Sequence, residues 1–100
     1  MADYELSTLA ASDIENIYEY TIGHFALDQA RSYLTGLFEM CRVLAQTPKM
    51  GRAAQDLAPN LRRFEYRSHI VFNTPKDEGV FIDRVLHERM DIDGRIEAGK

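Results

Sequence analysis

The sequence has a single cysteine, no tryptophan and only three prolines among its 100 residues. One cysteine cannot form an intramolecular disulfide, so the fold has to rest on a hydrophobic core, which a chain of this length can bury. No stretch approaches the roughly 18 apolar residues that a membrane span requires. The first residues, Met1–Glu5, are acidic and lack the basic and then apolar pattern of a signal peptide. We therefore expect a cytoplasmic protein.

Acidic residues outnumber lysine and arginine by 16 to 12, which gives a net charge of −4, and the basic residues are unevenly distributed. Residues 1–48 hold two arginines against seven acidic residues, a net charge of −5, whereas residues 49–76 hold six basic residues against two acidic ones, a net charge of +4. A chain of net negative charge repels phosphate overall, so sequence-specific nucleic-acid binding is not expected. The local basic zone predicts a specific contact with an anionic group or an acidic protein segment.

The N-terminal quarter of the chain predicts a short strand followed by a helix. Tyr4 and Leu6 alternate with acidic residues, which is the pattern of a half-buried strand. Ser7 stands at an N-cap position, and Gly23 is suited to the C′ position that ends a helix. Between them lies one stripe of residues with helical spacing, formed by Ala10, Ile14, Ile17, Tyr18 and Thr21.

A second amphipathic stripe runs from Ala30 to Ala45 and includes Cys41, which we expect to be a small buried hydrophobe. Thr47-Pro48 ends this helix, because the residue before proline is biased away from the helical conformation. The short connection His24-Phe25-Ala26 makes the two helices antiparallel. Gly36 within the second helix predicts close packing against the first helix or the sheet.

The second half of the chain predicts a β-meander. Lys49–Asn60 is expected to be a structured loop, Arg67-Ser68 a tight turn, and Thr74–Gly79 a polar hairpin loop. The predicted strands are Leu61–Tyr66, His69–Asn73 and Val80–Leu86.

The resulting order β-α-α-β-β-β defines an α+β fold, with an N-terminal edge strand and an antiparallel helix hairpin packed on a small antiparallel sheet. We expect one domain over residues 1–100, with an ordered core at about 3–92 and a C-terminal tail at 93–100. The last residues, Ile96–Lys100, are expected to be frayed. The aromatic side chains, Tyr20 and Tyr33 among them, are expected to be mostly core.

Several short motifs occur in a characteristic order along the chain. They are Tyr4-x-Leu6-Ser7, Ala10-x-x-Asp13-Ile14-x-x-Ile17-x-x-Tyr20, Gln29-Ala30-x-x-Tyr33-x-x-x-Leu37, Leu44-Ala45-x-x-Pro48-x-x-Gly51-Arg52, Pro59-x-Leu61-Arg62, Ser68-His69-x-x-x-Phe72 and Arg84-Val85-Leu86-His87-x-x-Met90-Asp91. In this order and spacing the chain resembles ParE-type toxins of the RelE/ParE superfamily, from bacterial type II toxin–antitoxin modules. The family's fold agrees with the one that the patterns predict.

The resemblance implies a toxin that is neutralised in a hetero-oligomer with a ParD-like antitoxin and that inhibits DNA gyrase, which blocks replication. RelE-type members of the superfamily instead cleave mRNA in the ribosome. A third possibility is a binding module that has lost its toxicity.

The endonuclease alternative would use Arg62, Arg84 and His87 for charge stabilisation and acid–base chemistry. No tyrosine follows Tyr66, however, so the C-terminal tyrosine of RelE-type toxins is missing. We therefore predict a gyrase-binding toxin without its own catalytic site. No cofactor or metal is expected, because the three histidines are too far apart in the pattern to form a zinc site with Cys41.

The residues expected to bind the antitoxin or the target combine the basic zone with the segment after the last strand. They are Arg52, Arg62, Arg63, Arg67, Arg84, His87, Arg89 and Met90. Arg62 and Arg63 point to opposite faces of a strand, so they cannot hold one ligand together. His69 is expected to be structural, and His87 either an acid–base group or a hydrogen-bonding residue at the start of the tail.

Overall fold

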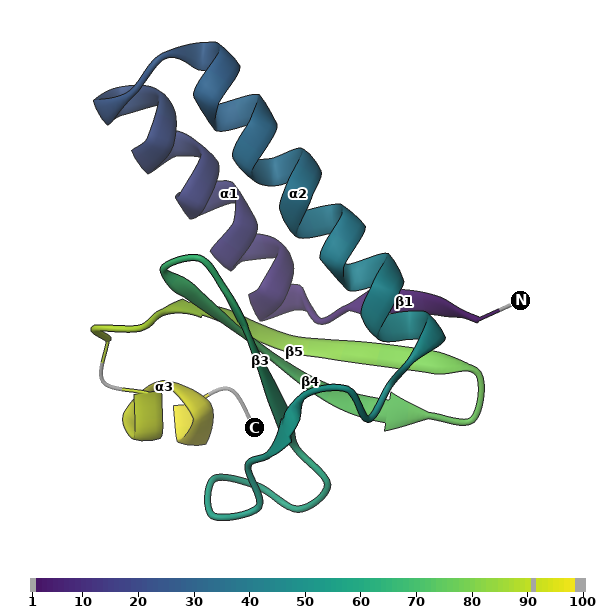
Figure 1. Ribbon diagram of the computed structural model, residues 1–100. Helices are drawn as coiled ribbons and strands as arrows, with labels where there is room; N and C mark the ends of the chain where they lie inside the picture. The colour runs from purple at the N-terminus through teal and green to yellow at the C-terminus, as the bar shows by residue number, and fades with distance from the viewer. Residues whose placement is uncertain (1, 91, 99–100) are drawn as a thin grey trace.

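The computed structural model places two long helices across one face of a five-stranded sheet (Figure 1). It describes residues 2–90 and 92–98. In chain order the elements are β1 (Asp3–Leu6), α1 (Thr8–His24), α2 (Leu27–Gln46), β2 (Arg52–Ala53), β3 (Arg62–Tyr66), β4 (His69–Lys76), β5 (Gly79–His87) and α3 (Ile92–Ala98). The predicted strand, helix hairpin and meander are all present, so the α+β architecture is confirmed.

The strand order in the sheet is β1-β5-β4-β3-β2. β1 is an edge strand, as expected, but it runs parallel to β5, with Tyr4 opposite Val80, so the sheet is mixed. β2 was not predicted: it lies in the segment expected to be a loop and pairs Arg52 with Arg63. A strand of two residues is too short to show the alternation on which strand prediction depends.

The hairpin between β4 and β5 is tighter than the sequence suggested. Thr74–Lys76 were expected in a loop but belong to β4, and Lys76 pairs with Gly79. Only Asp77 and Glu78 remain in the turn, and Gly79 has a φ of +110°, which side-chain-bearing residues rarely adopt. Pro75 suggested a loop, but β3 pairs with β4 only as far as Asn73, so the proline lies where β4 is open on one side.

β5 contains a bulge that the sequence did not reveal. Phe72 pairs with Arg84 but the next residue of β4, Asn73, pairs with Ile82, so Asp83 is an extra residue in β5. A single extra residue reverses which face the following side chains occupy. Ile82 and Val85, an odd number of residues apart, both pack into the core beneath the helices as a result.

Ser7 fixes the start of α1 and ties it to the sheet. Its Oγ accepts a hydrogen bond from the backbone N–H of Ala10 at 2.9 Å and donates one to the Asp83 carbonyl at 2.7 Å. The predicted end of this helix was wrong by three residues, because α1 continues through Gly23 to His24 and its C-cap is Phe25. α2 ends at Gln46, as the following threonine and proline predicted.

The sheet separates two apolar clusters. One lies between the sheet and α1–α2 and includes Cys41, which is fully buried as expected; burial raises the pKa of its thiol to about 11. The other lies on the opposite face, beneath residues 54–61 and α3, where Figure 1 shows the chain's C-terminal helix. Ile96 was expected to be frayed, but it is only 5% exposed and packs in this second cluster.

In the part of the chain that the structure describes, no helix has both the length and the apolar composition needed to span a membrane.

Candidate functional site

A groove of about 960 Å³ lies at the end of the sheet where β3 turns into β4. Both long helices, the β3–β4 turn, the end of β5 and α3 contribute side chains to it. Figure 1 shows that the helix hairpin, this turn and the end of β5 lie on the same side of the molecule. Elements that are distant in the sequence therefore build one concave surface.

The helix hairpin supplies an apolar end to the groove. Tyr20 and Phe25 line it and are 62% and 52% exposed, and Ile17 lies deeper. The expectation that Tyr20 is a core residue was wrong, because most of its side chain is exposed. Its ring stacks on that of His24, with centroids 4.0 Å apart. Exposed aromatic surface of this kind is characteristic of protein interaction sites.

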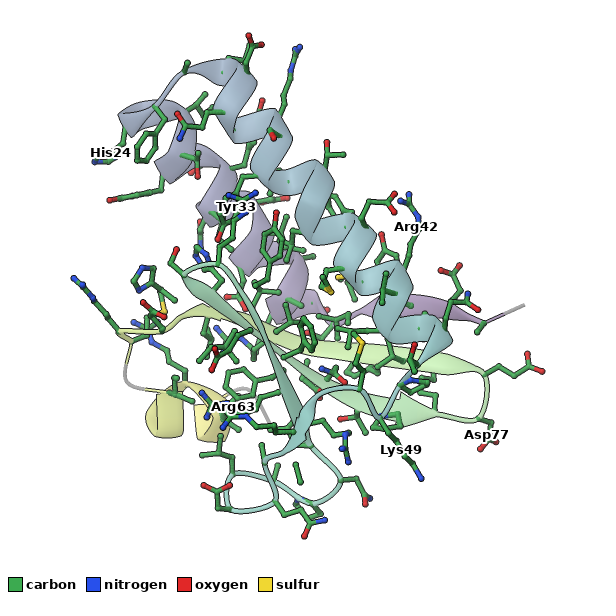
Figure 2. The ribbon with its side chains drawn as sticks, viewed as in Figure 1. His24, Tyr33, Arg42, Lys49, Arg63 and Asp77 are labelled. Carbon is green, nitrogen blue, oxygen red and sulfur yellow. The ribbon has the colours of Figure 1, made fainter. Side chains whose placement is uncertain are left out.

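The opposite end of the groove is polar and centres on Arg67 in the β3–β4 turn. Arg67 has a φ of 54°, in the left-handed region. Its guanidinium lies 5.8 Å from the centre of the Tyr33 ring and 5.6 Å from that of Tyr66, within cation–π distance of both. The Tyr66 hydroxyl donates to the Tyr33 carbonyl at 3.0 Å, which holds the two rings together. Figure 2 shows Tyr33 between α2 and the sheet.

Two histidines lie next to this arginine, on the same face of the sheet. His69 and His87 are directly opposite each other on β4 and β5, with ring centroids 5.3 Å apart. The Tyr33 hydroxyl contacts Nδ1 of His69, and the backbone N–H of Arg89 donates to Nδ1 of His87 at 3.1 Å. Burial lowers the pKa of His69, and repulsion from His87 lowers it further. At neutral pH His69 is therefore uncharged.

Arg84 and Asp13 also line the groove, but their charges are paired with each other. Arg84 donates from Nε and Nη2 to the two carboxylate oxygens of Asp13 at 2.8 and 2.9 Å. These hydrogen bonds raise the pKa of Arg84 above its ordinary value. Arg67, Arg89 and Arg95 have no acidic partner among the side chains that the structure describes, which exclude those of Asp91, Asp93 and Glu97, so the unpaired charges described in the groove are cationic.

The groove brings together part of the predicted binding set. Arg67, Arg84, His87, Arg89 and Met90 all line it, and Met90 is 42% exposed, as its position after the last strand suggested. Asp91, the last residue of the motif that begins at Arg84, lies outside the described residues.

The other three predicted residues lie elsewhere. Arg52 forms an exposed ion pair with Glu65 at 3.2 Å, and Arg62 donates to the carbonyls of the segment before β2. Arg63 lies over the Phe72 ring at 5.5 Å, on the face of the sheet that α3 covers (Figure 2). Arg62, proposed for the endonuclease alternative, lines a separate hollow of about 370 Å³ rather than the groove that contains Arg84 and His87.

Tyr33, Tyr66 and His69 belong to the site but were not among the residues predicted to bind. A sequence signal was available for His69, because a two-residue turn at Arg67-Ser68 places it at the same end of the meander as the predicted basic residues. The tyrosines could not be found this way, since their contact with Arg67 depends on how α2 packs on the sheet.

The fold is that of a known class of bacterial toxin–antitoxin proteins. A chain from the chromosomal ParDE toxin–antitoxin system of P. aeruginosa superimposes with a TM-score of 0.72 at 19% sequence identity, covering 87% of this chain and 96% of that one.

The sequence narrows this class to one family. The family model for the ParE toxin of the type II toxin–antitoxin system parDE matches residues 4–92. Toxin ParE1 of Mycobacterium tuberculosis is 36% identical over 91 residues, covering 90% of this chain and 93% of that protein. Toxin ParE1 of Caulobacter vibrioides is 33% identical over 92 residues, with the same coverage. The chain belongs to the ParE toxin family, and the resemblance inferred from its motifs is confirmed.

Proposed function

We propose that this toxin inhibits DNA gyrase and that a ParD-like antitoxin neutralises it by binding an acidic, partly apolar segment in the groove. Membership of the ParE family supports gyrase inhibition. The observation that supports the antitoxin site is the combination, in one groove, of an exposed aromatic end and a cationic end.

The charge of the groove favours an acidic partner. The chain carries a net charge of −4, yet Arg67, Arg89 and Arg95 are gathered in the groove without acidic partners among the side chains that the structure describes. Complementary charge increases the association rate and selects against wrong partners, while aromatic side chains supply most of the affinity. A protein segment with both acidic and apolar side chains matches both ends of the groove.

Gyrase inhibition is tested directly with the purified toxin. In supercoiling and DNA-cleavage assays we expect loss of supercoiling and accumulation of cleaved DNA, both reversed by the antitoxin. The same preparation is added to translating ribosomes. Cleavage of mRNA there, with gyrase unaffected, would contradict the proposal and favour the endonuclease alternative.

The antitoxin site is tested by replacing one exposed apolar residue. Phe25→Ser removes aromatic surface from the groove, and we expect at least tenfold weaker antitoxin binding by calorimetry. Val43→Ser is the matched control, because Val43 is 42% exposed on α2 but does not line the groove. Equal effects of the two substitutions would place the antitoxin elsewhere.

A further inference from the structure

We propose that the polar end of the groove is a proton-linked carboxylate site. In this site Arg67 binds a side-chain carboxylate of the antitoxin segment, and the imidazole of His69, which faces that of His87, takes up a proton when it binds. The proposal rests on the proposed function for its partner, and it adds the residue that anchors that partner and a pH dependence of the complex.

The backbone of Arg67 adopts a conformation that is unfavourable for arginine. Its φ of 54° lies in the left-handed region, where glycine, asparagine and aspartate are favoured and arginine is strained. The turn would fold more readily with asparagine at this position. An arginine kept in a strained backbone conformation at the edge of a groove points to a role in binding.

Two tyrosine rings orient the side chain of Arg67. Tyr33 and Tyr66 meet edge to face, 5.2 Å apart, and both contact the guanidinium. The rings restrict the rotamers of the arginine side chain in the free toxin. Less conformational entropy is therefore lost when the arginine binds a ligand. No ion pair of Arg67 is present among the described residues, so its guanidinium is oriented and available for a carboxylate.

The histidine pair supplies further hydrogen-bond donors. Since Nδ1 of His87 accepts the N–H of Arg89, the neutral His87 ring carries its proton on Nε2. His69 lies beside it with Nδ1 in contact with the Tyr33 hydroxyl. A carboxylate between Arg67 and these rings would therefore contact N–H groups as well as the guanidinium.

Charged and titratable groups from each element around the histidine pair line the same groove. Among the side chains that the structure describes they are Asp13 of α1, Tyr33 of α2, Arg67 of the turn, Arg84 of β5, Arg89 after β5 and Arg95 of α3, and Glu88 also acts on His69. Glu88 and Asp13 favour a protonated His69, but the Asp13 charge is already held by Arg84. In the free toxin, burial and the neighbouring imidazole outweigh them.

The direction of the pH dependence follows from this balance. His69 is neutral in the free toxin at neutral pH, and a bound carboxylate beside it stabilises the imidazolium. The complex then holds more protons than its separated components, so affinity rises as pH falls. Uptake of one proton corresponds to at most about tenfold tighter binding for each pH unit.

A carboxylate is favoured over a phosphate of nucleic acid. The net charge of −4, and the −5 carried by residues 1–48 that form both groove-lining helices, repel a polyanion at long range. The apolar end, with Tyr20 and Phe25, suits the side chains of a protein segment.

The proposal is tested by calorimetry of the toxin with the antitoxin at about pH 6 and pH 7.5, in buffers of different ionisation enthalpy so that proton uptake is measured. We expect proton uptake and tighter binding at the lower pH.

Arg67→Asn should weaken binding about ten- to hundredfold without lowering the urea midpoint, because asparagine tolerates the left-handed backbone. His69→Gln should lose the pH dependence, because His69 is the group that takes up the proton. Arg31→Gln, at an exposed arginine of α2 outside the groove, is the control.

A second measurement separates this proposal from the proposed function. Glutarate and inorganic phosphate are titrated into the free toxin, and the imidazole resonances are followed by NMR. Saturable shifts with glutarate that disappear in Arg67→Asn support the site, whereas shifts with phosphate alone would overturn the carboxylate assignment. Antitoxin binding that is independent of pH and of Arg67 would overturn this inference and leave the proposed function standing. Absence of antitoxin binding under all conditions would overturn both.

Discussion

Asp13 of α1 and Arg84 of β5 form a nearly buried ion pair, with side chains only 12% and 10% exposed. The Asp13 carboxylate also accepts the backbone N–H of Val85 at 3.0 Å, and Arg84 donates from Nη1 to the carbonyl of Arg95 at 3.0 Å. The pair therefore links the first helix, the last strand and the C-terminal helix. Arg84 was predicted as a binding residue, but its guanidinium is occupied by these contacts.

Asp13→Asn should be strongly destabilising. It leaves the Arg84 charge nearly buried without its carboxylate, and we expect a loss of about 3–5 kcal/mol in the free energy of unfolding, measured by urea denaturation. Glu39→Gln is the control, since it breaks the exposed Arg42–Glu39 pair and should cost only about 0–1 kcal/mol. Similar costs for the two variants would contradict the structural role of the buried pair.

Gly36→Ala should destabilise the protein although alanine favours helices. A Cβ at this position would lie 2.1 Å from the Tyr66 hydroxyl oxygen, so the ring would have to move, at a cost of about 1–3 kcal/mol. The same substitution at Gly23 meets no atom within 4 Å and should stabilise by up to about 1 kcal/mol. Opposite signs in thermal unfolding are expected. Stabilisation by both would show that the ring moves freely.

Ile96→Ala should cost about 2–5 kcal/mol, because the side chain is buried against Phe72 and Leu86 on the outer face of the sheet. Ile22→Ala, at an isoleucine that is 40% exposed on α1, should have a much smaller effect. Urea denaturation measures both. A negligible cost at Ile96 would indicate that α3 does not hold the sheet in solution.

The stability of the free toxin should fall on mild acidification. The pKa of His69 is lowered in the folded state by burial and by His87, so unfolding takes up a proton. The stability contributed above the ordinary histidine pKa of about 6.5 is then lost as pH falls through the folded-state pKa. Urea unfolding at about pH 7.5 and 5.5 should show this loss, and His69→Gln should reduce it. A variant at exposed His24 controls for removal of an imidazole. An unchanged pH dependence in His69→Gln would show that protonation of another group causes the loss of stability.

The candidate site could be predicted only in part. Arg67, Arg89 and Met90 were found because charge and position after a strand are visible in the sequence. Arg52, Arg62 and Arg63 carry the same charge, but neighbouring side chains and carbonyls bind or cover them. Charge density along a chain does not show which cations face a common surface, because that depends on side-chain direction and on packing between elements.

The helix hairpin and the meander could be predicted from the sequence alone, because hydrophobic period, the Ser7 cap and the breakers at Thr47-Pro48 act locally, and the family from the order and spacing of the motifs. The composition of the site depends on tertiary packing. The extra residue Asp83 turns His87 to the same face as His69, and the packing of α2 on the sheet brings Tyr33 beneath Arg67. A bulge changes the face of every later residue in its strand, and its position depends on the pairing partner rather than on local sequence.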